Sequence, residues 1–432
     1  MRNFYILSGG TFVDIAPHFS VAARAFGTIG RTLLPLLQAA ADEQGKKDLV
    51  FHLILTRMAL GGQVRTTEEQ RLIEMAGLKD LITNTDIECL VDYLTSLATT
   101  RGIIMTAALA DFQATELTTG GMTSTEIGTR RSRLESSQTL SVAFEAAPKL
   151  VSRIRKERKD IFLVACKTTA GATADEQYLK GLSLVKRASC NLVLANDIRT
   201  HLNMIVTPEQ ARYHETTHRE DALRGLAEMI VLRSDLHFTR TTIVPGEPIR
   251  WESDLIPSSL RTVVDHCIAR GAYKPFEGKT VGHFATRGPD GTILTSRRKT
   301  NFNQLPEIGL VQIEPVGEEE IIAHGFKPSV GGQSQRIIFE EHPEVDCIVH
   351  MHCPLLPDSK IPVREQRPYE CGSHECGENT SSGLGIFGTI KAVMLDKHGP
   401  NIVFPRDTDP AMVIRFIEAN VDLRGRTDGL YA

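Results

Sequence analysis

Residues 347–354 read CIVHMHCP, a short apolar run that ends in two histidines one residue apart. The run favours a buried strand, and side chains two positions apart on a strand share one face. His350 and His352 are therefore expected to point the same way. Two imidazoles presented together serve either as ligands of one metal ion or as a hydrogen-bonded pair in a core, and the spacing fits both.

The composition is that of a globular protein long enough for two or three domains, with 432 residues. Hydrophobic residues make up 41%, charged residues 24%, and the net charge is −4, so nothing favours nucleic-acid binding. No apolar run approaches the ~18 residues of a membrane span, and the N-terminus lacks the apolar core of a signal peptide. The eight scattered cysteines favour reduced thiols, and we expect a cytoplasmic protein with no membrane partner.

The first half of the chain alternates apolar runs with amphipathic stretches. Short continuous apolar runs between helices indicate a parallel sheet that is covered on both faces. In such sheets ligands bind beyond the carboxyl ends of the strands. The expected strands are NFYILSG (3–9), DLVFHLILT (48–56), GIIMTAALA (102–110), DIFLVACKT (160–168) and NLVLAND (191–197), and helices are expected between them, for example over 28–44 and 85–100.

Polar residues follow three of these runs, at the rim where a ligand is expected. The glycines of an SGGT turn let backbone amides approach a phosphate, although a glycine pair also makes an ordinary tight turn. The acidic and amide side chains are either helix caps or parts of one site. The residues expected to bind a nucleotide or phosphate at this rim are Ser8, Gly9, Gly10, Thr11, Asp111, Asn196 and Asp197.

Residues 1–210 resemble the phosphopantothenate–cysteine ligase family of coenzyme A biosynthesis. The resemblance is carried by SGGTFVDIAP (8–17), MTAALADFQ (105–113), TLSVAFEAAPKLVSRI (139–154) and NLVLANDI (191–198). It implies a Rossmann-like fold that binds CTP or ATP with magnesium and activates a carboxylate as an acyl-nucleotide. Where the family has an asparagine and a lysine near the first helix, this chain has Ala23 and Thr28. The family's lysine-rich loop reads TRRSR here, so Arg130, Arg131 and Arg133 join the expected nucleotide or phosphate site.

The second half begins after a turn-rich stretch, and we expect domains over residues 1–236 and 258–432. Residues 258–425 resemble the class II aldolase/adducin family, through GHFATRGPDGTILTS (282–296), the stretch from Lys327 to His352, and VMLDKHGPNIVF (393–404). The resemblance implies an α/β domain with a mainly antiparallel sheet and a divalent metal, usually zinc. It assigns the metal to His350, His352 and His398. The expected fold class is therefore α/β, with a Rossmann-like parallel sheet followed by this second domain.

The catalytic glutamate of that family is replaced here by Gly331, which has no carboxylate to move a proton. Glu370 and Glu375 are the candidates to replace it, unless they are ordinary loop residues. The family's phosphate pocket corresponds to TSRRKT (295–300), which is either an anion site or a solvated hairpin. The expected anion-binding residues of the second domain are Arg297, Arg298, Lys299 and Ser329.

Together these features predict a two-domain enzyme. The second domain is expected to be a metal-dependent lyase, epimerase or dehydratase acting on a small phosphorylated or carboxylated hydroxy-carbonyl compound. The first is expected to be a nucleotide-dependent ligase-like domain, and the chain to form a homo-oligomer. The alternative is that the second domain is an assembly or ligand-sensing module, with amide-forming ligase activity confined to the first.

Overall fold

The computed structural model describes residues 1–134, 139–317, 320–329 and 332–430. The chain forms two compact units, and each is built from more than one stretch of sequence. The first contains Met1–Pro208 and Tyr213–Val231, and the second contains Glu209–Arg212 and Leu232–Ala432. The chain therefore crosses between the units after Pro208, after Arg212 and after Val231.

A seven-stranded sheet forms the centre of the first unit, in the order β12-β11-β10-β9-β5-β1-β4. The pairs from β4 through β1, β5 and β9 to β10 are parallel, and β11 is antiparallel to β10. The central strands are almost entirely buried, as expected for apolar runs covered on both faces. The strands are β1 (Arg2–Gly10), β4 (Leu49–Leu55), β5 (Thr100–Ala108), β9 (Phe162–Thr169), β10 (Leu192–Asp197), β11 (Asn203–Val206) and β12 (Arg212–Thr216).

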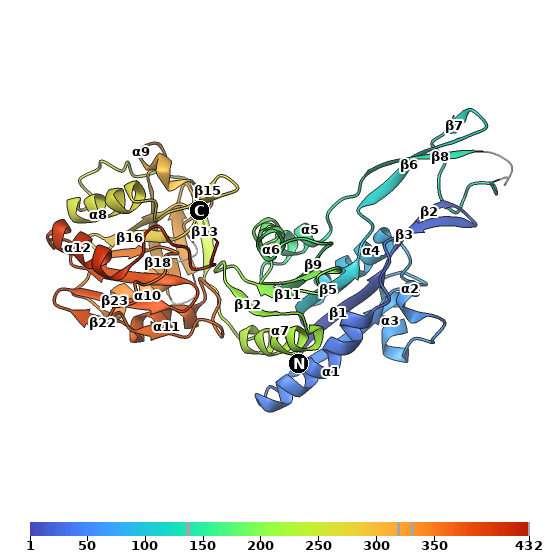
Figure 1. Cartoon of the computed structure of the whole chain (residues 1–432), viewed down its shortest axis with the longest axis horizontal. Helices are drawn as coiled ribbons and strands as arrows, with labels where there is room; N and C mark the ends of the chain where they lie inside the picture. Colours follow the sequence, from blue (N-terminus) through green and yellow to red (C-terminus); the bar gives the residue numbers. More distant parts are fainter. Residues whose placement is uncertain (135–138, 318–319, 330–331, 431–432) are drawn as a thin grey trace. The chain divides into compact units, whose positions relative to one another are not determined.

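Helices cover both faces of this sheet, with α1 and α7 along one face and α5 and α6 along the other (Figure 1). Burial of one side of each helix explains the amphipathic pattern of the intervening sequence. The helices are α1 (Thr28–Glu43), α2 (Arg57–Leu60), α3 (Thr67–Met75), α4 (Asn84–Ser96), α5 (Val151–Glu157), α6 (Ala174–Ala188) and α7 (Arg219–Arg233).

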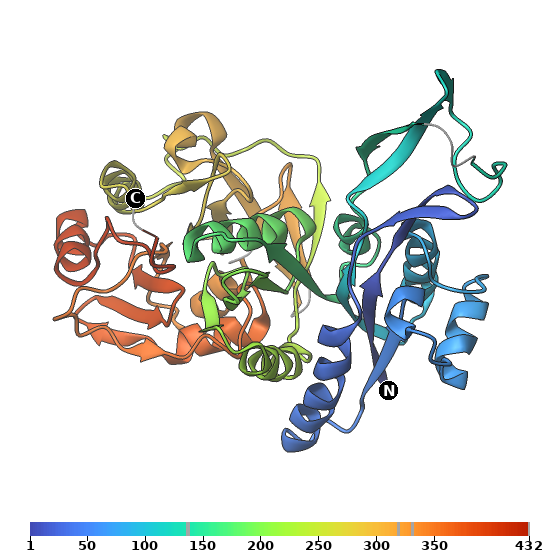
Figure 2. The same cartoon turned by 45° about the vertical axis from the view of Figure 1, so that its right-hand side comes forward.

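Two smaller antiparallel elements project from one end of the large sheet, as Figures 1 and 2 show. One is the hairpin of β2 (Phe12–Ala16) and β3 (Phe19–Ala22). The other contains β6 (Phe112–Thr119), β7 (Met122–Ser124) and β8 (Leu140–Ala146), with β6 in the middle. Nearly every residue of β8 is exposed, so this extension has little core of its own.

The second unit is built on a ten-stranded sheet. Its pairs are antiparallel except β13–β19 and β21–β23, so it is mainly antiparallel. The order is β13-β19-β18-β17-β16-β20-β24-β23-β21, and β22 also pairs with β23. The strands are β13 (Arg240–Val244), β16 (His283–Arg287), β17 (Ile293–Ser296), β18 (Leu310–Val316), β19 (Glu320–His324), β20 (Cys347–His350), β21 (Val363–Arg364), β22 (Gly385–Phe387), β23 (Ile390–Leu395) and β24 (Gly399–Phe404), with the separate pair β14 (Pro275–Phe276) and β15 (Lys279–Thr280).

Each face of this sheet carries its own hydrophobic core, because successive side chains along a strand point to opposite faces. Phe284 and Val349 belong to one cluster, while their neighbours Ala285 and Ile348 belong to the other. Helices α8 and α12 contribute to the first cluster and α10 to the second. The helices are α8 (Ser258–Ala269), the 3-10 turn η1 (Phe302–Gln304), α9 (Leu305–Ile308), α10 (Gly332–Glu341), α11 (His374–Ser382) and α12 (Pro410–Asn420).

The parallel sheet of the first unit and the mainly antiparallel sheet of the second confirm the expected α/β fold class. The turn-rich stretch between the expected domains is structured as part of the second unit. It contains β13, which pairs with β19, and Trp251, which is buried in a core cluster. Within the described parts of the chain, no helix is long and apolar enough to cross a membrane.

Candidate functional site

Three histidines converge in the second unit, where two neighbouring strands end. His350 is the last residue of β20, His352 follows it, and His398 lies in the turn between β23 and β24. Because β20 pairs with β24, the turn that contains His398 is brought beside His350. One nitrogen from each of the three rings lies within 4.8 Å of the others. His350 and His398 are buried, and His352 is half-buried.

The donor set fits a divalent metal ion. The ring Nδ1 of His350 lies 2.9 Å from the carbonyl oxygen of Pro400, which can only accept, so Nδ1 carries the proton and Nε2 presents its lone pair. Burial lowers the pKa of His350 to about 4, so this ring is neutral at physiological pH, as a ligand must be. The Nε2 atoms of His350 and His398 are 3.2 Å apart. Two imidazoles bound tetrahedrally to zinc at ~2.0–2.1 Å have nitrogens roughly 3.3 Å apart.

A fourth histidine, His283, lies against this cluster and was not expected from the sequence. It is the register partner of His350 across the β16–β20 pair, and the two ring centroids are 4.8 Å apart. The Nε2 of Gln335 lies 2.8 Å from the Nδ1 of His283. Burial, and then the neighbouring His350, lower the pKa of His283 well below its usual value, so this ring is also neutral. His283 therefore packs behind His350, a candidate metal ligand, as an uncharged ring.

A cavity of about 10 Å³, the size of one water molecule, adjoins His352. Its polar lining comes from distant parts of the sequence. Lys274 precedes β16, Gln210 belongs to the short stretch that joins the second unit, and the rest comes from the C-terminal segment after α12. The residues of this wall that sequence analysis missed are Gln210, Lys274, Arg426, Thr427 and Asp428.

Glu370 and Glu375 are the expected replacements for the missing base. Glu375 lies in α11, and Glu370 lies just before this helix. Among the residues that the structure describes, the metal-ligand cluster consists of the three histidines, and neither glutamate joins it. Glu370 is 7% exposed. The Glu375 carboxylate accepts hydrogen bonds from the backbone and ring nitrogens of His237, the latter at 2.6 Å. Gly331, at the position of the family glutamate, lies outside the described residues.

The segment that carries Glu370 is anchored on a buried ion pair. Glu209 and Arg233 have fully buried side chains, and the Arg233 Nη1 lies 3.4 Å from the Glu209 carboxylate. The backbone amide of Cys371 donates to Glu209 at 2.7 Å, and the Nε of Arg233 donates to the carbonyl oxygen of Arg367 at 3.0 Å. The pair therefore fixes both ends of the stretch on which Glu370 lies.

The expected anion-binding residues of the second domain form one basic cluster. The backbone amide of Ser329 donates to Ser296 and that of Arg298 donates to Lys327, so the two segments run side by side. The guanidinium carbon of Arg297 lies 3.5 Å from the centre of the Phe326 ring. Burial, and then the charges of Arg298 and Lys279, lower the pKa of Lys299. Arg297 is partly committed to protein contacts, and the anion-binding role of the cluster stays a prediction.

In the first unit, the glycines of SGGT serve close packing of the backbone. A Cβ added to Gly10 would lie 1.9 Å from the carbonyl oxygen of Ala23. The amides of Gly10 and Thr11 donate to the carbonyl oxygens of Ala25 (2.7 Å) and Ala108 (3.2 Å). These two amides are thus engaged by backbone partners rather than directed at a ligand.

Ser8 instead faces the N-terminus of α1. A Cβ added to Gly30 would lie 2.7 Å from the Ser8 hydroxyl oxygen. That oxygen has no hydrogen-bond partner within the described residues, and Ser8 is 1% exposed. The helix begins after Gly27, whose φ of 76° no other residue type adopts easily, and no side chain caps it. Uncapped amides and the helix dipole favour an anion at this position.

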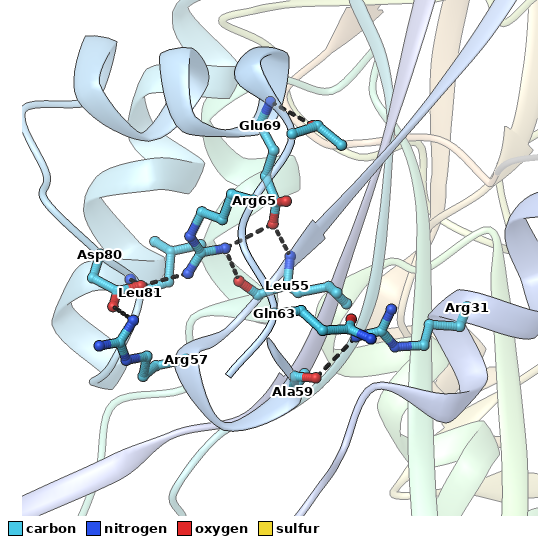
Figure 3. A network of polar contacts seen from close by, with 10 residues as sticks. Arg31, Leu55, Arg57, Ala59, Gln63, Arg65, Glu69, Asp80 and Leu81 are labelled. Atoms are coloured by element: carbon cyan, nitrogen blue, oxygen red, sulfur yellow. Dashed lines mark hydrogen bonds and ion pairs between the residues drawn. The ribbon is translucent and has the colours of Figure 1, made fainter. Parts of the chain in front are cut away.

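A polar network holds the end of β4 next to this helix (Figure 3). Arg65 donates to the carbonyl oxygen of Leu55 and to Glu69 and Asp80, and Glu69 accepts from the amide of Leu55 at 2.7 Å. Arg65 and Glu69 are buried, with side chains 5% and 7% exposed. Arg57 adds a further ion pair to Asp80. The network fixes the path of the chain just before α2, which packs on β1 and β4.

A cavity of about 320 Å³, large enough for a small ligand, is lined in part by the residues that directly follow SGGT, beginning with Phe12. Two of the expected site residues border its lining. Thr11 donates to Asn84 at 2.7 Å, and Lys149 donates to Asp111 at 2.5 Å. Asn84 and Lys149 line the cavity with aromatic and charged side chains, including Phe12, Phe112 and Arg153.

The remaining expected residues of the first domain have other surroundings. Asp197 accepts from the amides of Gly171, Ala172, Arg199 and Thr200, which makes it an organiser of two loops. Asn196 accepts from Thr168 at 3.2 Å. Arg130 and Arg133 are exposed on the chain between β7 and β8, and Arg131 donates to the Glu126 carbonyl oxygen there.

No protein-family model matches the sequence, and no curated protein is significantly similar to it. Solved structures do match each part of the chain. A DNA/pantothenate metabolism flavoprotein from Streptococcus pneumoniae is 16% identical and aligns over 53% of this chain and 98% of its own, with a TM-score of 0.41. The C-terminal domain of the coenzyme A biosynthesis bifunctional protein CoaBC is 12% identical over 54% of this chain and 94% of its own, with a TM-score of 0.36.

A smaller part of the chain matches a different group of structures. L-fuculose 1-phosphate aldolase is 16% identical and aligns over 38% of this chain and 84% of its own, with a TM-score of 0.29. Both resemblances expected from the sequence are thus found among solved structures: to the phosphopantothenate–cysteine ligases for about half of the chain, and to the class II aldolases for a smaller part.

Proposed function

We propose that the second unit is a metal-dependent lyase, epimerase or dehydratase for a small hydroxy-carbonyl compound that carries a phosphate or a carboxylate. The observation that carries the proposal is the buried cluster of His350, His352 and His398 with convergent ring nitrogens. A divalent ion held by these rings would act as a Lewis acid toward a substrate oxygen. Three protein ligands are typical of catalytic rather than structural zinc, because one position is left open.

The protein's own groups supply the rest of the proposed site. Pro400 holds His350 in the tautomer that exposes Nε2, and burial keeps the ring uncharged. The basic cluster of Arg297, Arg298 and Lys299 is the proposed partner of the substrate anion. Glu370, which is buried on an anchored segment, is the first choice for the group that moves a proton, and Glu375 is the second.

Metal content of the purified protein tests this proposal. We expect about one divalent ion per chain, with zinc the first choice for three imidazoles and manganese, cobalt or iron the alternatives. The double substitution His350→Ala and His352→Ala should remove it, since one ligand cannot retain the ion. His324→Ala is the matched control, because this histidine lies in the same unit and pairs with Glu314 instead. Full metal content in the double variant would contradict the assignment.

For the first unit we propose binding of a nucleotide or a phosphorylated compound, in support of ligase-like chemistry. The supporting observations are the buried Ser8 hydroxyl at the uncapped N-terminus of α1 and the cavity of about 320 Å³ beside Thr11 and Asp111. A ligand that binds only the folded protein raises its melting temperature. We expect such a shift with CTP or ATP in the presence of magnesium, and a smaller one in Ser8→Ala. Absence of any shift at millimolar nucleotide or phosphorylated acid would refute the proposal.

The alternative for the second unit is an assembly or ligand-sensing module without turnover. The glycine at position 331, in place of the family's glutamate, favours this alternative. Bound metal without turnover on any hydroxy-carbonyl compound would support it. Homo-oligomer formation also stays a prediction; the exposed side chains of Phe112, Met122 and Phe144 on the projecting strands are consistent with it, and analytical ultracentrifugation tests it.

A further inference from the structure

The C-terminal segment after α12 runs back along the chain that leaves β20. Val421 forms a bridge with Leu355, and the amide of Asp422 donates to the carbonyl oxygen of Pro354 at 2.9 Å. Farther on, the ammonium group of Lys274 donates to the carbonyl oxygens of Leu423 (3.0 Å) and Gly425 (2.8 Å). The segment is therefore fixed by hydrogen bonds as well as by Val421 and Leu423, whose side chains are buried in a core cluster.

Thr427 in this segment contacts the backbone of two of the three histidines. Its amide donates to the carbonyl oxygen of His352 at 3.3 Å. Its hydroxyl group donates to the carbonyl oxygen of His398 at 3.2 Å. One residue thus joins two potential ligands that come from different strand ends.

Neither of these two histidines is held by sheet pairing of its own. Strand β20 ends at His350, so His352 lies beyond the ladder. His398 lies between the paired residues Leu395 and Gly399, in the turn that joins β23 to β24. Metal–ligand distances have to agree to ~0.2 Å, so contacts that hold these two backbones together matter for a metal site. One such contact is the close packing of Gly399, where an added Cβ would lie 3.2 Å from the Cα of His352. Thr427 adds direct hydrogen bonds to both histidine backbones.

Thr427 is itself held rigidly. The guanidinium of Arg426 makes two hydrogen bonds to the Asp428 carboxylate, at 3.0 and 2.7 Å, across the position of Thr427. Asp428 is 6% exposed and also accepts from the amide of Leu430 at 3.1 Å. The amide of Gly429 donates to the carbonyl oxygen of Arg426, which closes the turn.

We propose that Thr427 is a positioning residue of the metal site, which fixes the distance between His352 and His398 through its amide and its hydroxyl. The inference rests on the proposed metal-binding function of the second unit. It predicts that the hydroxyl group of a residue far from the histidines in sequence determines metal affinity. Partners that orient metal ligands typically contribute 10–100-fold to metal affinity, and we place this single bond at the lower end, about tenfold.

The test compares Thr427→Val, which keeps the shape and the backbone amide but removes the hydroxyl, with Thr427→Ser, which restores the hydroxyl. Zinc affinity is measured on the full chain by competition with a chromophoric chelator, and the cobalt(II) absorption spectrum reports ligand geometry. The control is Ser259→Ala. Ser259 lies in α8 of the same unit, outside the proposed site, and its hydroxyl also donates to a backbone carbonyl oxygen, that of Arg406, at 2.6 Å.

We expect zinc affinity to fall about tenfold in Thr427→Val with an altered cobalt spectrum, and to stay within about threefold of wild type in Thr427→Ser and Ser259→Ala. Equal affinity in Thr427→Val and wild type would overturn the role of Thr427 alone. An equal loss in Thr427→Ser would also overturn it, since the hydroxyl would not matter. Failure of the wild-type protein to bind any metal would overturn the metal site as well. Urea unfolding of each metal-free variant verifies that the variant is folded. If Thr427→Val does not fold, Thr427→Ala takes its place.

Discussion

Acidification should destabilise the metal-free second unit, and His350 should account for much of the effect. In the folded protein burial lowers the pKa of His350 from 6.5 to about 4. Below pH ~6.5 the unfolded chain takes up a proton that the buried ring does not, so stability falls as the pH decreases. The loss begins near pH 6.5 and levels off below pH ~4.

The size of the effect follows from the two pKa values. The full difference is worth about 3 kcal/mol, and about 2 kcal/mol of it is reached between about pH 7.5 and about pH 5. His283 acts in the same direction, since burial and then its neighbour His350 also lower its pKa. Comparing the wild-type protein with His350→Gln therefore measures the contribution of His350 together with its effect on His283. The variant is expected to be less stable at both pH values but to lose about 2 kcal/mol less on acidification.

The assay is urea unfolding of the metal-free protein at the two pH values. The single tryptophan, Trp251, is 3% exposed and lies in the second unit, so its fluorescence reports the unfolding of that unit. His18→Gln is the control, because His18 is an exposed residue of the first unit. The reasoning is refuted if His350→Gln and wild-type protein lose the same stability between the two pH values.

Three further predictions concern charged side chains. Glu370→Gln should lower turnover by about two orders of magnitude with metal retained, because the amide cannot accept a proton. If turnover is unchanged, the same assay on Glu375→Gln decides whether either glutamate is the base. Arg233→Met should lower the free energy of unfolding by about 3–5 kcal/mol, because it leaves the charge of the fully buried Glu209 without its ion-pair partner. Urea unfolding followed by Trp251 fluorescence measures the loss, and adding Glu209→Gln should restore most of it. No recovery in the double variant would show that the charge is not the cause. Arg65→Met should destabilise the first unit by a similar amount, about 3–5 kcal/mol, because it leaves the buried Glu69 without its ion-pair partner. Urea unfolding followed by circular dichroism measures this, and a loss below about 1 kcal/mol would mean that Glu69 finds other partners.

Local sequence pattern was enough to predict the parallel sheet and part of the histidine cluster. The continuous apolar runs that end near Leu55 and Asp197 form strands of the sheet. This was predictable because strands that are covered on both faces need apolar side chains on both faces. The shared direction of His350 and His352 follows from strand geometry, and the ring centroids are 5.2 Å apart. The prediction that His398 belongs with these two histidines rested on the family resemblance, because no local sequence pattern indicates it.

The residues around the cluster depend on tertiary contacts that no local pattern encodes. His283 faces His350 only because of the register of β16 on β20, and Thr427 reaches two histidines only because the chain returns after α12. No local pattern marks Glu209 and Arg233 as buried, since charged residues are rarely buried unless they pair. The glycine pair of SGGT fits either a phosphate loop or a tight turn, and the carbonyl oxygens of Ala25 and Ala108 that accept from its amides became visible only in the folded chain.

The threefold crossing of the chain between the units limits how the protein can be divided. Neither unit is one continuous stretch of polypeptide, because residues 209–212 belong to the second unit although residues 213–231 belong to the first. A fragment that starts at Leu232 keeps Arg233 but lacks Glu209, its buried counter-charge, and Gln210, which borders the cavity at His352. Separate expression of the two halves therefore leaves the second half incomplete unless the peptide 209–212 is supplied again. The two proposed activities cannot be assigned to independent polypeptides by a single cut in the gene.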